Sequence, residues 1–425
     1  MSKLKLPATR LSLFVAFCLI AVAFTAARSQ QAAITYPTVP SKDLAAAAAD
    51  NNAFAIDLYG HLTGRSGNLL FSPYSINSAL AMAYAGARGQ TATQMAQAMH
   101  FSLQGEQLHA AIGALSGQLM TEASDGGKTL YQLSVADAVW TQQGLPYNPD
   151  FLRVLQKDYA SELRQSDFVH SYQQARTDIN RWVAQNTADK IPNLLPDGSV
   201  DSTTRMILVN AIYFKGDWAT PFKTERTSDQ PFHTDGQNSI STPLMFGNVF
   251  CLASETADLQ IVELPYNGDK LSMVILLPRS VDGMGTLEKQ LTSEHIDQWI
   301  SQLVDQSVNV HLPKFKLTCS FELADTLKSM GMRDAFSYPI ADFTGMTTAD
   351  RFRISAVVHQ ALIDVNEEGT EAAAATGVTM MAGAVMRQRL MDFRADHPFI
   401  FLIRQQSTGA ILFAGRLMNP KATAS

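Results

Sequence analysis

The sequence predicts an α+β fold, because helix signals crowd its beginning and strand signals dominate the rest. Helix-capping patterns recur in the first hundred residues after the N-terminal leader, and β-rich apolar runs recur from residue 133 onward. The chain has no internal repeat, so this order indicates large antiparallel or mixed sheets. A length of 425 residues allows one large domain or two to three ordinary ones.

The N-terminus has the pattern of a secretory signal peptide. Lys3, Lys5 and Arg10 precede the apolar run "LSLFVAFCLIAVAF", and small residues up to Ala27 follow it. The run is too short for a comfortable membrane span. We therefore expect residues 1–27 to be removed and the mature chain to be secreted, into an extracellular or periplasmic space.

The charge balance excludes several kinds of partner. The net charge is −6, and removing the three basic residues of the signal peptide brings it to −9. A chain this acidic, with scattered basic residues, is a poor match for nucleic acid or an acidic polysaccharide. No later segment has eighteen uninterrupted apolar residues, so we expect no membrane span in the mature chain.

Two cysteines remain after processing, Cys251 and Cys319. They either pair or stay buried as free thiols. Free burial is favoured, because a secreted fold of this size does not need a disulfide to be stable.

The first ordered element is expected to be a helix. Residues 28–42 are polar and contain proline, which predicts a mobile leader. Residues 43–62, "DLAAAAADNNAFAIDLYGHL", then have the composition of a helix that ends at Gly64.

Two further helices follow from capping signals. Ser72 is placed as an N-cap, with Pro73 at the first helical position and Gly86 near the C-terminal end. Thr91 and Gln94 have the spacing of a capping box that opens another helix.

The remaining elements are mostly strands. Alternating or continuous apolar runs predict them, and one polar-faced segment between them, 172–191, predicts a helix. The predicted strands lie at 133–142, 205–218, 259–266, 271–278, 308–317, 354–365 and 399–417, the last containing a hairpin turned at Ser407, Thr408 and Gly409.

The sequence lacks the motifs of the common enzymes. It has no HExxH, paired CxxC, Walker loop, GxGxxG or GxSxG. His359 lies in an apolar strand, where a hydrogen-bonded core histidine is favoured over a general base. Glu367 and Glu368 are adjacent, which in a strand directs them to opposite faces. We therefore expect no catalytic site, no metal and no cofactor.

One stretch does not fit a packed helix, namely 366–389, "NEEGTEAAAATGVTMMAGAVMRQR". It has no large apolar residue at helical spacing. As a strand it would have one face of small or compact side chains, with Glu371, Ala373 and Ala375 on the other face. The small face would consist of Thr370, Ala372, Ala374, Thr376 and Val378. The stretch either enters a sheet or serves as a flexible linker.

The chain resembles a serpin over about residues 43–420. The blocks that carry the resemblance, in order, are "NLLFSPYSINSALAMAYAGARGQT", "INRWVAQNTADKIPNLLPDGSVDSTTRMILVNAIYFKGDW", "HLPKFKL", "VVHQALIDVNEEGTEAAAAT" and "FRADHPFIFLIRQQSTGAILFAGRL". The resemblance implies a fold of three β-sheets with about nine helices and an exposed reactive-centre loop, here at about 367–391.

The family's activity is suicide inhibition of serine proteases, with cysteine proteases as a second target class. The protease cleaves the loop, becomes covalently attached, and is carried along as the hinge of the loop inserts into the main sheet. The hinge residues that the resemblance assigns are Glu367, Glu368, Gly369, Thr370, Glu371, Ala372, Ala373, Ala374, Ala375 and Thr376.

The resemblance also implies roles for residues outside the loop. Polar side chains of a shutter region would tie the helix beneath the sheet to the strands that must part, and they correspond to Ser72, Ser75, Asn210 and His359. Glu367 would pair with Lys314 and so steady the loop before insertion. Trp218 corresponds to the tryptophan of the breach at the top of the sheet.

The reactive bond has two possible registers. Counting seventeen positions from Glu367 gives Gly383, with Ala384 after it, and small residues there suit an elastase-like or subtilisin-like protease. Counting backward from "HPF" points near Arg387, which suits a trypsin-like protease. We expect Gly383–Ala384, with the further alternatives Met381 and Met386.

The alternative is that the chain is a non-inhibitory serpin, which acts as a carrier, chaperone or storage protein. Such members tend to have a charged or bulky residue at the first inward hinge position, or prolines in the loop, whereas this chain has Thr370 and four alanines. The segment 103–115 lacks the basic row with which some serpins bind heparin. We expect a monomer whose partner is the target protease, in a covalent complex.

Overall fold

The computed structural model describes residues 36–126, 128–369 and 390–422. The predicted signal peptide, most of the leader, the hinge from Thr370 to Thr376 and all candidate reactive-bond residues from Met381 to Arg387 lie outside these ranges. Within them, the structure has nine α-helices and sixteen strands, so the predicted α+β class is confirmed.

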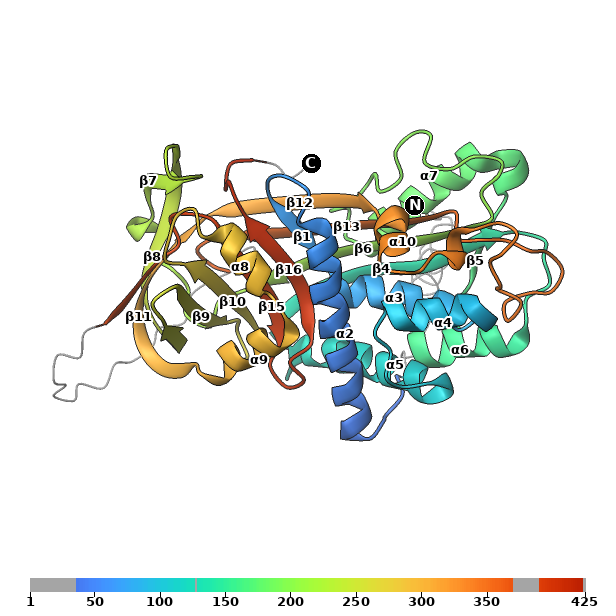
Figure 1. Cartoon of the computed structure of the whole chain (residues 1–425), viewed down its shortest axis with the longest axis horizontal. Coiled ribbons are helices and arrows are strands. Elements are labelled where there is room, and N and C mark those ends of the chain that lie inside the picture. Colours follow the sequence, from blue (N-terminus) through green and yellow to red (C-terminus); the bar gives the residue numbers. More distant parts are fainter. Residues whose placement is uncertain (1–35, 127, 370–389, 423–425) are drawn as a thin grey trace, which may run out of the picture. The chain divides into compact units, whose positions relative to one another are not determined.

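The helices, with the labels of Figure 1, are α2 (Ser41–Leu62), α3 (Pro73–Tyr84), α4 (Gly89–Ala98), α5 (Gly105–Glu122), α6 (Pro149–Tyr159), α7 (Phe168–Asn186), α8 (Met284–Gln290), α9 (Ser293–Ser301) and α10 (Ala324–Ser329). Two short 3-10 helices are η1 (Thr224–Arg226) and η2 (Asp334–Phe336).

The strands are β1 (Leu69–Phe71), β2 (Ser124–Asp125), β3 (Lys128–Thr129), β4 (Tyr131–Gln142), β5 (Arg164–Ser166), β6 (Met206–Gly216), β7 (Ser228–His233), β8 (Ser239–Glu255), β9 (Leu259–Pro265), β10 (Leu271–Pro278), β11 (Val304–Pro313), β12 (Phe315–Glu322), β13 (Ala356–Val365), β14 (Met391–Arg394), β15 (Phe399–Gln405) and β16 (Ile411–Leu417).

These strands form three sheets. A five-stranded sheet has the order β12-β13-β6-β4-β5, and its central pair, β13 and β6, is parallel. A nine-stranded sheet has the order β1-β16-β15-β10-β9-β8-β11-β14, with β7 paired to β8. The long strand β8 links β9 to β7 and β11. Its C-terminal residues pair with β9, and the rest of the strand pairs with β7 and β11. The third sheet is the two-stranded ribbon β2–β3.

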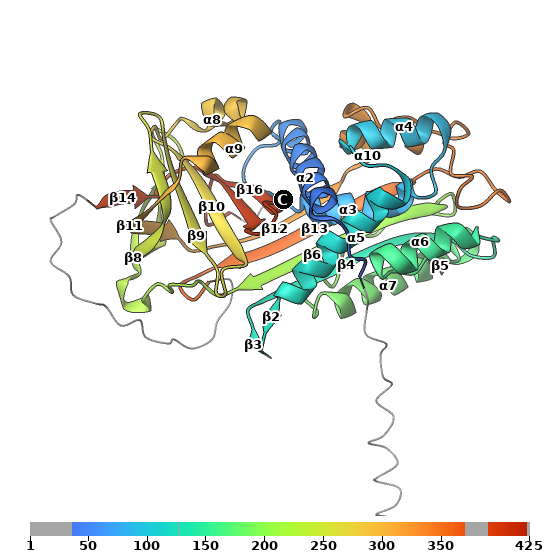
Figure 2. The same ribbon diagram turned by 90° about the horizontal axis from the view of Figure 1, so that it is seen from below.

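The five-stranded sheet is covered on both faces. Ile207, Val209 and Ala211 of β6 belong to the apolar cluster that includes α7, whereas Met206 and Leu208 belong to the main core, which includes α3. Figure 2 shows α3 and α7 on opposite sides of these strands. Burial on both faces explains why β6 is apolar almost without interruption instead of alternating.

The Ser72 cap was predicted correctly. Ser72 accepts a hydrogen bond from the Ser75 backbone N–H at 3.2 Å, and Pro73 opens α3. The capping box at Thr91 and Gln94 was wrong, because α4 begins two residues earlier, at Gly89.

Tertiary contacts explain the error in α4. Thr91 is buried, and its hydroxyl accepts a hydrogen bond from the Asp342 N–H at 3.0 Å. The side-chain oxygen of Gln94 accepts from the backbone N–H groups of Arg333 and Asp334, at 2.9 and 2.8 Å. Both side chains therefore hold a distant loop against the helix instead of capping it.

The end of the predicted mobile leader is fixed against α5. Gly113 and Gly117 lack the side chains that would fill the surface where Pro37 and Tyr36 lie. A Cβ atom on Gly117 would come 2.7 Å from Cγ of Tyr36. Burial raises the pKa of the Tyr36 hydroxyl above its ordinary value. Tyr36 and Pro37 therefore pack against α5, and α2 begins at Ser41, two residues before the helix start expected at residue 43.

Cys251 and Cys319 are both buried free thiols, as favoured above. Burial raises the pKa of each thiol to about 12, so both are un-ionised at neutral pH. In the described part of the chain, no helix combines the length and apolar character that crossing a membrane requires.

Candidate functional site

The chain turns sharply directly after β13, at the base of the predicted hinge. Asn366 N donates to Gly369 O at 2.8 Å, and Gly369 N donates to Asn366 O at 3.2 Å. The side-chain oxygen of Asn366 accepts from Glu368 N at 3.0 Å. Gly369 also forms a bridge with Asp217, which follows the end of β6. The turn thereby brings the chain from the end of β13 to the end of β6.

Gly369 is required at this turn for two reasons. Its φ angle is +138°, a conformation that L side chains rarely adopt. A Cβ atom would lie 2.6 Å from Trp218 N and would also collide with Gly216 O and Asp217 Cα. The backbone of the hinge therefore packs directly on the backbone that follows β6.

Trp218 holds the turn from the β6 side. Its backbone N–H donates to Glu368 O at 2.8 Å, and its indole Nε1–H donates to Asn366 O at 3.0 Å. The indole is buried and stacks on Tyr266 with ring centroids 4.6 Å apart. The resemblance had placed Trp218 at the top of the sheet, and the structure puts it in contact with the hinge.

Glu367 and Lys314 form the expected ion pair. Lys314 Nζ lies 2.8 Å from Glu367 Oε2, and Thr227 Oγ1 donates to Glu367 Oε1 at 2.8 Å. Burial of the carboxylate opposes its ionisation, but the hydrogen bonds from Lys314 and Thr227 outweigh this and lower the pKa of Glu367. Phe222 N adds a backbone hydrogen bond to Glu367 O at 2.8 Å. The first hinge residue is thus fixed through side chain and backbone.

Midway along the same strands, three polar side chains form a row across the sheet. His359 of β13 is the register partner of Asn210 of β6, and Asn210 is the register partner of Asp137 of β4. His359 Nδ1 is hydrogen-bonded to Asn210 Oδ1, and Asn210 Nδ2 donates to Asp137 Oδ1 at 2.5 Å. The row therefore crosses the parallel β13–β6 pair.

Helix α3 is tied to both ends of this row. The backbone N–H of Ser72 donates to His359 Nε2 at 3.1 Å. Ser75 Oγ donates to Asp137 Oδ1 at 2.8 Å and accepts from Asn210. The four residues that the resemblance assigned to a shutter are thus brought together in one network, between a helix and the strands above it.

The network defines the protonation of His359. The imidazole is fully buried, and burial lowers its pKa from 6.5 to about 3. At neutral pH it is uncharged, and since Nε2 accepts from Ser72, Nδ1 carries the proton and donates to Asn210.

Asp137 also belongs to this row, although the sequence alone did not predict it as a site residue. Desolvation raises the pKa of its carboxyl group well above the usual range, although hydrogen bonds from Ser75 and Asn210 favour the ionised form. The one available signal was an acidic residue inside a strand whose neighbours Ala136 and Ala138 are apolar. Only the register of β4 against β6 shows that it completes the row.

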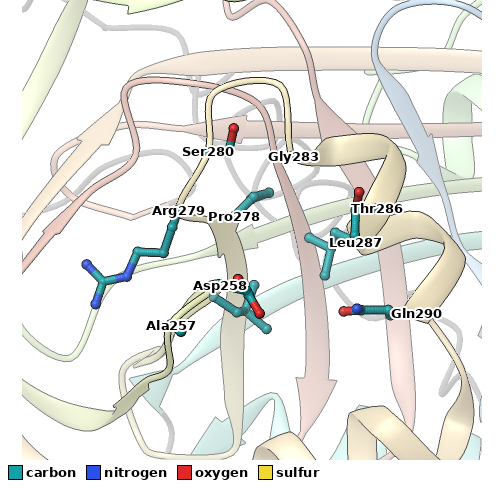
Figure 3. A pocket seen from close by; sticks show the side chains of 10 residues that line it. Ala257, Asp258, Pro278, Arg279, Ser280, Gly283, Thr286, Leu287 and Gln290 are labelled. Carbon is teal, nitrogen blue, oxygen red and sulfur yellow. The ribbon is translucent and has the colours of Figure 1, made fainter.

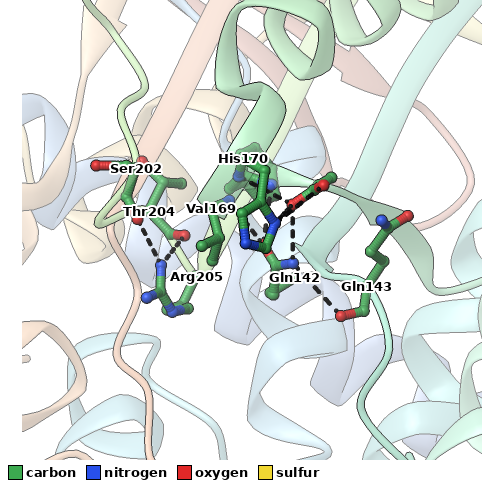
Figure 4. A network of polar contacts seen from close by, with 9 residues as sticks. Gln142, Gln143, Val169, His170, Ser202, Thr204 and Arg205 are labelled. Atoms are coloured by element: carbon green, nitrogen blue, oxygen red, sulfur yellow. Dashed lines mark hydrogen bonds and ion pairs between the residues drawn. The ribbon is translucent and has the colours of Figure 1, made fainter.

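The end of β4 is also joined to the helix on the other face of the sheet (Figure 4). Gln142 Oε1 accepts hydrogen bonds from the backbone N–H groups of Phe168 and Val169, at 2.9 and 3.2 Å. Asp167 caps the same helix, because its Oδ1 accepts from His170 N at 3.1 Å. The first turn of α7 is therefore hydrogen-bonded to the end of β4.

A separate cavity of about 480 Å³ lies beside β9, β10 and α8 (Figure 3). The side chains of Arg279, Asp258 and Gln290 lie around it, and Arg279 forms an ion pair with Glu255 at 2.7 Å. It contains none of the predicted site residues. In the described residues, no three His, Cys, Asp or Glu side chains are placed to hold a metal ion together.

Comparisons with known proteins identify the family. A model of the family "Serpin (serine protease inhibitor)" matches residues 49–420. The leukocyte elastase inhibitor of Bos taurus is 41% identical over 382 residues, which are 88% of this chain and 99% of the relative. The leukocyte elastase inhibitor of Xenopus laevis is 39% identical over 376 residues, covering 86% and 97% of the two chains.

Solved structures agree with this assignment. Uncleaved ovalbumin is similar with a TM-score of 0.79 and 32% identity, over 88% of this chain and all of that one. A crystal structure of maspin is similar with a TM-score of 0.82 and 29% identity, over 89% of this chain and all of that one. The sheets, the hinge and the polar row described above therefore belong to a serpin, and this chain is a member of the serpin family of serine protease inhibitors.

Proposed function

We propose that the protein is a secreted suicide inhibitor of serine proteases that traps its target after cleavage of the segment between Gly369 and Leu390. An elastase-like or subtilisin-like target is favoured. The relatives named leukocyte elastase inhibitor and the small residues Gly383 and Ala384 support this choice. A trypsin-like target that cuts at Arg387 is the second possibility.

The observation that best supports this function is the parallel pairing of β13 and β6 next to the anchored base of the hinge. Ala356 to Leu362 pair with Ile207 to Tyr213 in parallel. The chain reverses direction at Asn366–Gly369, so the residues that follow would run antiparallel to both strands if they entered between them. Two antiparallel ladders would then replace one parallel ladder.

The energy of such an insertion suffices to trap a protease. Each added ladder hydrogen bond contributes about 0.5–1.5 kcal/mol, so about a dozen bonds would release on the order of 10 kcal/mol. That amount is comparable to the stability of a whole protease domain. The small face of the hinge, Thr370 to Val378, would let the strand pass between its neighbours without large side chains to bury.

Export is part of the proposal and is supported by the N-terminal pattern. A basic start, a short apolar run and small residues up to Ala27 make up the pattern of a secretory signal peptide, in which the small residues form the cleavage site. N-terminal sequencing of the protein recovered from the medium of expressing cells should find a start near Arg28.

The function is tested by incubating the mature protein with pancreatic elastase, chymotrypsin, trypsin and subtilisin. A complex that survives denaturing electrophoresis is expected with at least one of them, and the mass of the released C-terminal peptide would choose between Gly383 and Arg387. If every protease only clips the chain or ignores it, the inhibitor function is wrong and the carrier or storage alternative takes its place.

A further inference from the structure

An exposed apolar stripe extends from β8, over β11, to Leu390, which precedes β14 where the described chain resumes. Phe250 of β8 is 65% exposed, Leu252 of the same strand 36%, and Leu390, just before β14, 46%. Their neighbours Val249, Cys251 and Met391 are buried, at 4%, 3% and 6%. The alternation shows that these strands have one core face and one outer face, and that large apolar side chains occupy the outer one.

The strand register makes these side chains one contiguous surface. Phe250 lies opposite Ser307 of β11, and residues directly opposite in an antiparallel pair share a face. Met391 pairs with Val308 in parallel, which places Leu390 beside Ser307. The small Ser307 thus lies between Phe250 and Leu390 and covers neither. Single exposed apolar residues are ordinary, but a contiguous group of them indicates an interaction surface.

The stripe has an acidic border and lies beside a sheet edge. Asp305 is the register partner of Leu252. Asp392, 64% exposed, is the register partner of Asn309 on the same outer face, and its Oδ1 lies 3.7 Å from Nε2 of His311. β14 is the terminal strand of the sheet order and pairs with β11 on one side (Figure 2). A partner that fits would place an apolar side chain on Phe250 and a basic side chain near Asp305, or near Asp392 in competition with His311.

Chain length limits which partner can reach the stripe. Leu390 follows Ala384 by six residues, which span at most about 20 Å when extended. A protease domain of about 230 residues has a radius of gyration of about 17 Å. A protease engaged at the proposed reactive bond therefore has its own surface within reach of Phe250 and Leu390.

We infer that the stripe of Phe250, Leu252 and Leu390 is a docking surface for the target protease outside its active-site cleft, and that it selects proteases with an apolar side chain next to a basic one. This inference rests on the proposed function. It adds a determinant of specificity that is independent of the residues at the cleaved bond.

The test compares Phe250→Ser with Ile340→Ser. Ile340 is 62% exposed but lies in the loop before β13, so its variant controls for loss of an exposed apolar side chain. Association rate constants for covalent complex formation are measured with the protease that the wild type traps. Noncovalent binding is measured with the same protease after its nucleophilic serine is replaced by alanine.

Phe250→Ser should slow complex formation and weaken binding of the inert protease by about three- to tenfold. The number of inhibitor molecules consumed per protease should stay the same, and Ile340→Ser should match the wild type. Equal rates for all three proteins would overturn the docking surface while the inhibitor function stands. If the wild type traps no protease, the function fails and the docking surface with it. A wild-type dimer that Phe250→Ser converts to a monomer would show that a second copy occupies the stripe, which also overturns the inference.

Discussion

His359 lies directly opposite Asn210 in the parallel pairing of β13 and β6, and a hydrogen bond joins the two side chains. Any strand that enters between β13 and β6 has to break this bond and leave two buried polar groups to find new partners. The polar row therefore sets part of the barrier to opening the sheet.

The pH dependence of stability should report on His359. Its pKa of about 3 in the folded protein is below its unfolded value of 6.5, so the unfolded chain binds the additional proton at intermediate pH. The contribution to stability is fully present above pH 6.5 and is lost as pH falls toward 3, by about 1.4 kcal/mol per pH unit. We expect His359→Gln to flatten the dependence of the unfolding free energy on pH between 6.5 and 4.5.

Asp137 titrates with the opposite sign, since its raised pKa favours stability at low pH, a contribution that is lost as pH rises. Because it is present in both proteins, the difference between them isolates the histidine. The unfolding free energies of both proteins are measured by urea unfolding at each pH. If they change equally with pH across this range, His359 is not a buried neutral imidazole.

The ion pair at the base of the hinge should be measurable by a double-mutant cycle. Lys314→Met leaves the carboxylate of Glu367 buried with only Thr227 as side-chain donor, and is expected to cost about 1–2 kcal/mol at pH 7, since Lys314 is partly exposed. Glu367→Gln should make the lysine substitution nearly neutral. The coupling should vanish as pH falls through the lowered pKa of Glu367, and a coupling that persists at low pH would show that packing rather than charge joins the residues.

Replacing Gly369 should loosen the hinge. Gly369→Ala introduces both an unfavourable φ angle and a collision with the backbone of residues 216–218. Gly67→Ala is the matched control, because Gly67 has a φ of +80° but open space around its Cα. We expect Gly369→Ala to lower the unfolding free energy by about 1–3 kcal/mol more than the control. Equal losses in thermal unfolding would mean that the turn can move aside without cost.

The packing of the N-terminal segment on α5 predicts different outcomes for two similar substitutions. Gly60→Ala lies in a helix with nothing near the added methyl group and should stabilise by about 0.5–1 kcal/mol. Gly117→Ala gains the same helix propensity but displaces Tyr36, so it should destabilise the protein. Adding Tyr36→Gly should then improve stability relative to Gly117→Ala alone. If both alanine variants melt higher than the wild type, Tyr36 does not hold the segment in place.

The direction of the hinge side chains can be tested even though residues 370–389 lie outside the described ranges. Thr370→Arg should place a charge on the face that enters the sheet, so that the protease completes its reaction and leaves a cleaved inhibitor. Glu371→Arg puts the same residue on the opposite face and should preserve complex formation. The measurement is the ratio of covalent complex to cleaved inhibitor on denaturing gels. Equal ratios for Thr370→Arg and Glu371→Arg would refute the predicted alternation of side chains.

Local signals in the sequence predicted much of the fold but not its tertiary connections. Ser72 and Pro73 identify the start of α3, because a cap depends on neighbouring residues alone. β8 escaped prediction, since its mixture of serine, threonine, proline and exposed apolar residues reflects pairing with three different strands. Asp137 escaped because a lone acid in a strand has many explanations until its neighbour is known. The pairing of Glu367 with Lys314 came from the family resemblance and not from any local pattern.

The burial of β6 on both faces also determines the heat and the heat-capacity change that calorimetry would measure when a strand is added to the sheet. The helices α3 and α7 already exclude water from both sides of the sheet, and the side chains that would enter are mostly threonine and alanine. Such a transition removes little apolar surface from water, so its heat-capacity change would be small. The heat released would come instead from backbone hydrogen bonds formed in an interior from which water is excluded. The free energy of insertion would therefore be mainly enthalpic.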